Sequence, residues 1–177
     1  MSDLKVYLFC SRNKDNKNVK DFKPRRRAFL AYTDDINSFY QFDDFVKHGV
    51  PGEMSRMYES INPRDEAKVR KALTAKLVLD DNIQIGKISS IAVSVAAKKG
   101  CAADRKWLLD VDTRDRYILQ DILSLIPGNV PRRKYITPNG FGIIVARGFD
   151  TRTLLAKYKD ICDIKKDGMQ CVNWDQN

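Results

Sequence analysis

The order of strand and helix patterns in residues 106–165 is the feature that most limits the folds open to this chain. Apolar runs of strand length alternate there with segments whose apolar residues recur at helical spacing. Turn residues such as Pro127-Gly128 separate the segments. The predicted strands are 106–113, 133–137, 141–149 and 161–165, and the predicted helices are 114–126 and 151–160.

Strand, helix, strand, strand, helix, strand is the order of the split βαβ plan, called ferredoxin-like or RRM-like. In that plan the first and third strands are central, both helices cover one face of the sheet, and the other face is open to ligands. We therefore predict an α+β fold with a βαββαβ core. Residues 101–177 would form this core, and residues 1–100 an N-terminal α+β lobe packed on it within one compact domain. The lobe includes predicted strands at 4–9 and 28–32.

The remaining patterns favour a cytoplasmic protein. No apolar stretch approaches the roughly 20 residues that span a bilayer, and the first residues lack the charged lead of a secretory signal. The chain has four scattered cysteines and one histidine, His48, without the paired spacing of a zinc site. We expect neither a membrane nor an obligate protein partner.

Positive charge points to a polyanionic partner. The chain carries 32 basic and 23 acidic residues, a formal net charge of +9, and such a surplus favours nucleic acid. Basic residues also cluster beside predicted turns, in 12–27, in 98–99 with 105–106, and in Arg132, Arg133 and Lys134. Clusters of this kind are typical of surfaces that follow a phosphate backbone. A merely soluble basic protein is the alternative.

Asp110 and Asp112 interrupt the apolar strand KWLLDVDT. Because side chains alternate across a strand, the two carboxylates share a face, while Trp107, Leu109 and Val111 point the other way, toward the helices. Adjacent carboxylates repel unless a cation neutralises them, and their oxygens suit Mg²⁺ or Mn²⁺. For Asp112, capping of the next helix is an equal alternative.

The neighbouring strand 141–149 would place Gly142, Ile144 and Ala146 on the face of the aspartates. These residues leave room for a ligand but add no metal ligand. A third carboxylate would have to come from elsewhere, and Glu59, Asp150 and Asp163 are the candidates.

Two further segments combine chemistry with turn or helix-start signals. In residues 56–65, Arg56 and Arg64 are suited to phosphates and Tyr58 to stacking on a base. A helix that begins at Asn62-Pro63 and runs to Leu79 explains the same segment equally well. The turn containing Asn139 offers backbone N–H groups to a phosphate, although ordinary hairpin turns have this composition more often.

KWLLDVDT, a following helix and YITPNGFGIIVARGFD together resemble the catalytic core of the archaeo-eukaryotic primase superfamily. The resemblance implies an RRM-like sheet with an N-terminal unit, and metal binding by Asp110 and Asp112. A histidine of that superfamily, which holds nucleotide phosphates, would fall at about Gly142, where this chain has none. This departure disfavours nucleotide polymerisation and favours hydrolysis.

More narrowly, RMYESINPRDE, KWLLDVDT and TPNGFGIIV resemble the endonuclease IV family of T-even phages. That resemblance implies cleavage of single-stranded DNA at cytosines during degradation of host DNA, in the host cytoplasm.

The sequence therefore predicts a metal-dependent endonuclease that acts on single-stranded DNA with Mg²⁺ or Mn²⁺. The candidate catalytic residues are Asp110, Asp112, Glu59 and Arg56. The candidate DNA-binding residues are Tyr58, Arg64, Lys106, Arg132, Arg133, Lys134 and Asn139. Two alternatives stay open: a small primase or nucleotidyltransferase that uses the same aspartates, and a non-enzymatic nucleic-acid-binding phage protein.

Overall fold

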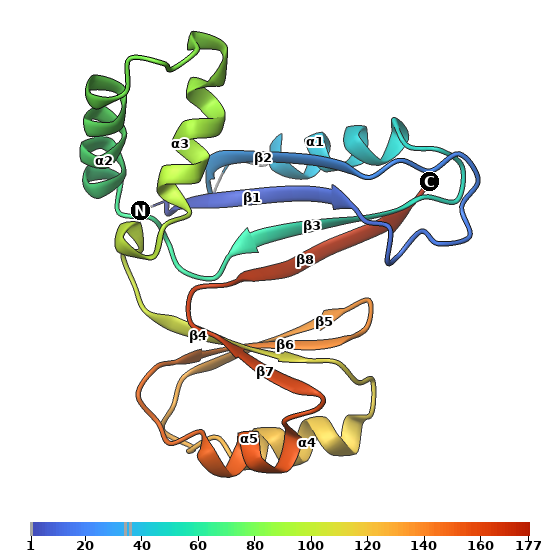
Figure 1. The fold of residues 1–177 in the computed structure, drawn as a ribbon. Coiled ribbons are helices and arrows are strands. Elements are labelled where there is room, and N and C mark those ends of the chain that lie inside the picture. Colours follow the sequence, from blue (N-terminus) through green and yellow to red (C-terminus); the bar gives the residue numbers. More distant parts are fainter. Residues whose placement is uncertain (1, 34, 36) are drawn as a thin grey trace.

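The computed structural model describes residues 2–33, 35 and 37–177. Within these residues the fold is α+β, with two antiparallel four-stranded sheets, five α-helices and two short 3₁₀ helices (Figure 1). The two sheets lie one above the other, and helices cover their outer sides. In the described part of the chain, no helix is both long and apolar enough to cross a membrane.

The first sheet has the strand order β2-β1-β3-β8. Its strands are β1 (Leu4–Ser11), β2 (Arg25–Tyr32), β3 (Met54–Ser60) and β8 (Met169–Gln176). One face packs on α1 (Asn37–Lys47) through an aromatic cluster that includes Phe9 and Phe42. At the Val6 end, the opposite face packs on α2 (Glu66–Leu79) and α3 (Ile88–Ala96) through Val69 and Val95.

The second sheet has the strand order β5-β6-β4-β7, and all neighbouring strands are antiparallel. Its strands are β4 (Lys106–Val111), β5 (Arg132–Thr137), β6 (Gly140–Ala146) and β7 (Cys162–Lys165). The helices α4 (Arg116–Ser124) and α5 (Arg152–Tyr158) both cover the face turned away from the first sheet (Figure 1). All six elements occur in the predicted order.

The core of the second sheet lies between its strands and these two helices. Leu109 and Val111 of β4 are buried there against Leu119 and Ile122 of α4, and Trp107 packs at the edge of the same cluster. The predicted direction of these three β4 side chains is therefore confirmed. Asp110 and Asp112 are left on the other side of the strand, which faces the first sheet.

The chain returns to the first sheet after β7. The strand β8 pairs with β3, from Met54 opposite Gln176 to Ser60 opposite Met169. A division at residue 101 consequently does not separate the two sheets, since residues 169–176 belong to the N-terminal one. The 3₁₀ helices η1 (Ile85–Lys87) and η2 (Lys99–Cys101) flank α3 in the connection that leads to β4.

The start of α2 differs from the sequence expectation. The helix begins at Glu66, and Asp65 is its N-cap, with the side chain accepting a hydrogen bond from Lys68 N. Asn62 instead lies buried below the helix, where it accepts a hydrogen bond from Lys106 N and donates one to Asp167. Asn62 therefore ties the two sheets together rather than starting a helix.

Candidate functional site

A cleft of about 450 Å³ opens between the inner faces of the two sheets. The first sheet contributes side chains of β1, β3 and β8, and the second contributes side chains of β4, β7 and the turn between β5 and β6. The cleft-lining residues used below are Arg12, Lys14, Arg56, Tyr58, Asp110, Asp112, Asn139, Lys165 and Gln170. Several of them are charged, so this cleft is a polar site.

Asp110 and Asp112 both line this cleft, as their spacing predicts. The Asp110 side chain is 32% exposed and Asp112 is exposed. Capping does not explain Asp112, because Asp115 is the N-cap of α4 and accepts hydrogen bonds from Tyr117 N and Ile118 N. The two carboxylates are therefore free of a role in the helix start and remain accessible from the cleft.

Lys165 of β7 forms an ion pair with Asp110. It reaches the carboxylate because β7 pairs with β4, with Lys165 opposite Leu108 and Asp163 opposite Asp110. The ammonium neutralises half of the negative charge of the aspartate pair. No pattern within β7 marks Lys165 as a cleft residue, so this partner could not be predicted from the sequence.

The oxygen donors of Asp110 and Asp112 fit a hard divalent cation, but they form only part of a shell. Within residues 2–33, 35 and 37–177, no group of three or more His, Cys, Asp or Glu side chains is arranged to hold a metal ion. The proposed third carboxylates are not in the cleft lining: Glu59 is paired with Lys5 at 2.8 Å and Asp150 with Arg152 at 2.7 Å. Asp163 is opposite Asp110 on the neighbouring strand and is exposed, but it too is outside the lining.

Arg56 is held at the wall of the cleft by Asp15. Its Nη2 donates to Asp15 Oδ1 at 2.5 Å, and Asp15 also accepts from Arg12 Nε at 2.9 Å. Arg56 is buried, whereas the Arg12 side chain is 39% exposed. The single negative charge of Asp15 therefore compensates only part of the positive charge of the two arginines. Net positive charge from Arg12 and Lys14 remains at the mouth of the cleft.

Tyr58 lies next to Arg56 on β3, half-buried in the cleft wall. Burial raises the pKa of its phenol, with the nearby Cys171 adding to the effect and Arg12 and Arg56 opposing it. The hydroxyl therefore stays protonated at neutral pH. A neutral aromatic ring at this place can stack on a base or donate a hydrogen bond to a phosphate.

Gln170 occupies the space over Gly142, beside the aspartates, that was predicted to be open to a ligand. Gly142 is opposite Asp110 in the sheet, and a Cβ on Gly142 would collide with the side-chain amide of Gln170. Gln170 is 1% exposed and its Nε2 donates to Cys171 O at 2.7 Å. The expected open space over Gly142 is thus filled by a strand that sequence analysis did not place here, and a larger side chain at Gly142 has no room.

Asn139 reaches the cleft from the turn between β5 and β6. The turn is fixed on both sides: Thr137 Oγ1 accepts from Gly140 N at 3.1 Å, and Arg114 donates to Pro138 O. Gly140 is required because a Cβ there would meet the backbone of Val111 and Thr113. This close approach brings the turn beside Asp112.

Several predicted DNA-binding residues lie elsewhere. Arg64 is buried and makes a bidentate ion pair with Asp167, at 2.9 and 3.0 Å, so it is not presented to a ligand. Lys106, Arg132 and Arg133 line a separate hollow of about 260 Å³. Lys134 is exposed on β5 and is in neither lining. The structure therefore brings together Arg56, Tyr58, Asn139 and the aspartate pair, but not the other candidates.

Sequence analysis also missed Arg12, Lys14 and Gln170 as individual site residues. For the first two a signal existed, since they open the basic stretch 12–27. Gln170 carried no signal, because its position depends on the return of β8 to the first sheet.

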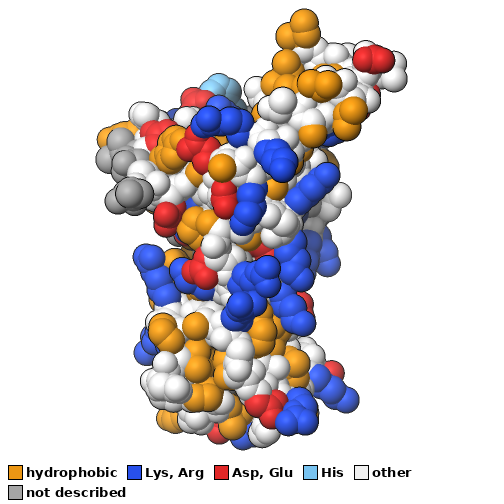
Figure 2. Space-filling model, turned by 90° about the vertical axis from the view of Figure 1, so that its left-hand side faces the viewer, with side chains coloured by type: hydrophobic (Ala, Val, Ile, Leu, Met, Phe, Trp, Pro, Cys, Tyr) orange, Lys and Arg blue, Asp and Glu red, His pale blue; other side chains and the backbone are white. Residues whose placement is uncertain are grey.

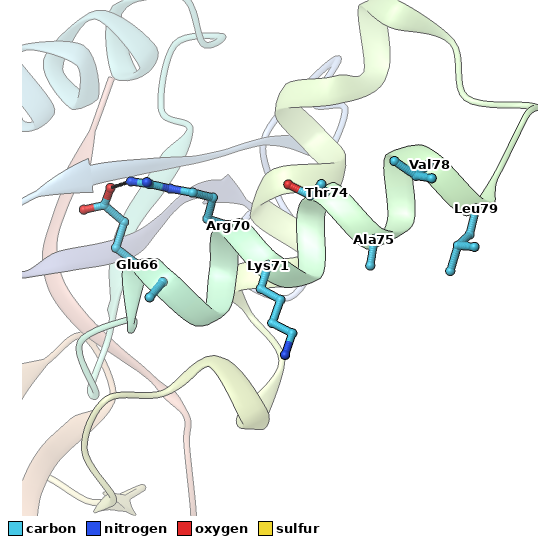
Figure 3. Close-up of a pocket in the computed structure, with 8 residues that line it drawn as sticks. Glu66, Arg70, Lys71, Thr74, Ala75, Val78 and Leu79 are labelled. Carbon is cyan, nitrogen blue, oxygen red and sulfur yellow. Dashed lines mark hydrogen bonds and ion pairs between the residues drawn. The ribbon is translucent and has the colours of Figure 1, made fainter.

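A further hollow, of about 870 Å³, has a different character. It runs along the outer side of α2 alone, where Glu66 pairs with Arg70 and the apolar Val78 and Leu79 are exposed near the helix end (Figure 3). It gathers no reactive side chains from other elements. The cleft with Asp110 and Asp112 is the better candidate for chemistry.

Comparison with protein-family models, with curated proteins and with solved structures gives no match for this chain.

Proposed function

We propose that the chain is a metal-dependent endonuclease that hydrolyses phosphodiester bonds of single-stranded DNA. The observation that carries the proposal is the pair Asp110, on β4, and Asp112, directly after it, in a cleft that also contains Arg12, Lys14 and Arg56. A metal-assisted attack on a phosphodiester requires carboxylates that bind the metal ion. It also requires basic side chains nearby that bind the phosphates. A cleft between two sheets favours a flexible single strand over a stiff duplex.

Each cleft residue has a role in this proposal. Asp110 and Asp112 would hold Mg²⁺ or Mn²⁺, and such an ion would lower the pKa of bound water and neutralise phosphate charge. Arg12 and Lys14 contact the DNA backbone, and Asp15 keeps Arg56 oriented toward the cleft. Tyr58 stacks on a base, and Asn139 donates to the sugar or phosphate. Lys165 releases Asp110 when the cation binds.

A small primase or nucleotidyltransferase is the second candidate. We propose that the second sheet follows the ferredoxin-like plan, supported by the order β5-β6-β4-β7 and the two helices on one face. This plan with two aspartates on a central strand is also the primase-like arrangement. The surroundings of Gly142 argue against polymerisation. The side chain of Gln170 fills the space in which a side chain at this position would lie, so the histidine of the primase superfamily has no room there. Cytosine preference and action on host DNA rest on the phage resemblance alone.

The test is an assay with end-labelled single-stranded and double-stranded oligonucleotides, with Mg²⁺ or Mn²⁺, and with or without EDTA. The proposal predicts shortened products from the single strand only, none in EDTA, and none from an Asp110→Asn variant. Added template and nucleotides distinguish the second candidate, because a primase extends strands. DNA binding that is unaffected by EDTA, together with no cleavage and no strand extension, would support a non-enzymatic nucleic-acid-binding protein. This result would overturn both the nuclease and the primase proposals.

A further inference from the structure

A second cationic hollow lies where the connecting segments join the two sheets. It measures about 520 Å³, and four basic side chains line it: Lys99, Arg105, Arg147 and Lys166. They come from η2, from the segment before β4, from the end of β6 and from the turn between β7 and β8. Figure 2 views the molecule from this side and shows Lys and Arg side chains gathered at the waist between its two halves.

The positive charge of this hollow is only partly neutralised from within. All four basic residues are exposed, and within the described residues none of their side chains forms an ion pair with a carboxylate. The two carboxylates in the lining are already engaged: Asp104 with Lys106 at 3.1 Å and Asp167 with Arg64 at 2.9 Å. The pKa of Asp104 lies below its ordinary value because its carboxylate accepts hydrogen bonds from Arg105 N and from Lys106, with a smaller contribution from the charge of Arg147.

Four cations that converge from separate chain segments without a direct ion pair repel one another and attract an anion. We propose that this hollow, formed by Lys99, Arg105, Arg147 and Lys166, binds phosphates of single-stranded nucleic acid at a second site, outside the lining of the aspartate cleft. The identity of the polyanion rests on the proposed function. The four residues are absent from the lining of that cleft, so the two sites are separate.

Apolar packing closes part of the interior between the sheets. Ile61, Leu108 and Ile144 are buried there with Tyr135 packed against them, so a strand cannot pass through this contact. Lys106, Arg132 and Arg133 line the neighbouring hollow and continue the positive charge toward β5. A strand that occupies both sites would therefore follow the surface around this contact, and binding strength should depend on strand length.

The test compares two double variants that each remove two exposed positive charges. Arg105→Ala/Arg147→Ala alters the hollow, and Arg116→Ala/Lys159→Ala, on the helices of the second sheet, is the matched control. Fluorescence anisotropy in EDTA measures binding of a labelled single strand of about 20 nucleotides, longer than the ~4–16 nucleotides covered by common single-strand-binding folds. EDTA keeps the measurement independent of cleavage.

The proposal predicts that the first variant weakens binding about tenfold and lowers the slope of log K against log salt by about 1.4, two phosphate contacts at about 0.7 each. The control keeps the affinity and slope of the unsubstituted protein. Competition by inorganic phosphate that equals competition by unlabelled strand would mean a site for free phosphate and overturn the proposal. So would identical slopes for the two variants, or no binding by the unsubstituted protein.

Failure of this inference and failure of the proposed function have different signatures. Metal-dependent cleavage with identical salt slopes for both variants contradicts only the second site. Weakened binding by Arg105→Ala/Arg147→Ala in a protein that cuts nothing contradicts only the nuclease.

Discussion

Lys165 on β7 donates a hydrogen bond to Asp110 Oδ2 on the neighbouring strand β4. The two side chains are 43% and 32% exposed, and an ion pair of such exposure contributes only about 0–1 kcal/mol. The pair can therefore open at little cost. Its position makes Lys165 a competitor for any cation that Asp110 holds.

Replacing Lys165 by Met should strengthen metal binding. Without the competing ammonium, the affinity for Mn²⁺ should rise by up to about fivefold, the equivalent of the ~1 kcal/mol upper value for such a pair. Isothermal titration with Mn²⁺ measures this, and Lys159→Met at the end of α5 is the matched control. Equal or weaker Mn²⁺ binding by Lys165→Met would mean that the lysine does not compete.

Arg64 should matter for stability rather than for direct contact with DNA. Because the Arg64–Asp167 pair is buried, removal of either partner leaves a buried charge without compensation, at a cost of about 3–5 kcal/mol. Urea unfolding of Arg64→Ala and Asp167→Ala measures the losses. The double variant should lose less than the sum of the two, and additive losses would contradict a direct pairing.

Glu53 should make the fold sensitive to acid. Burial opposes ionisation of Glu53, but hydrogen bonds from Ser11, Arg25 and Val50 N outweigh it and hold its pKa below the ordinary value. A carboxylate with a lowered folded pKa contributes stability above its unfolded pKa of about 4.3, and that contribution is lost as the pH falls through the folded pKa.

Glu53→Gln tests this directly. At pH 7 the variant should be about 3 kcal/mol less stable, since it leaves the partly buried Arg25 unpaired, and the difference should shrink below about pH 4. Unfolding curves from pH 7 to about pH 3 provide the measurement. A stability difference that does not change with pH would show that Glu53 is not ionised in the folded protein.

A double variant can test the close packing of the Gln170 side chain on Gly142. Gly142→Ala places a methyl group against the Gln170 amide and should destabilise the protein by about 1–3 kcal/mol. Adding Gln170→Ala should recover part of that loss, as measured by thermal unfolding. Gly100→Ala is the control, since no heavy atom lies within 4 Å of its added Cβ. A tolerated Gly142→Ala would contradict this packing and weaken the case against a histidine at that position.

Local patterns predicted the second sheet well because its central strands are buried runs. Leu109 and Val111 are apolar on the side of the helices, and Asp110 interrupts them on the other side, so spacing alone assigned the faces. The same reasoning missed β3, where Arg56 is buried although charged. Its burial depends on Asp15, which lies 41 residues away in the sequence, and no local pattern reports such a partner.

Long-range pairing explains the remaining differences. The strand β8 joins β3 across most of the chain, and only this return brings Gln170 against Gly142 and closes one wall of the cleft. Lys165 reaches Asp110 through the pairing of β7 with β4. Sequence spacing could place the two aspartates together, but the cations and the amide around them depend on the tertiary fold.

In the proposed mechanism, Asp110 and Asp112 jointly hold a divalent cation beside a bound single strand. Mn²⁺ binding, followed by electron paramagnetic resonance with a non-cleavable phosphorothioate single strand present, tests it most directly. We expect that Asp110→Asn and Asp112→Asn each weaken Mn²⁺ binding by about tenfold or more, while Asp160→Asn, beyond the end of α5, leaves it unchanged. Undiminished Mn²⁺ binding by Asp110→Asn would rule out this metal site.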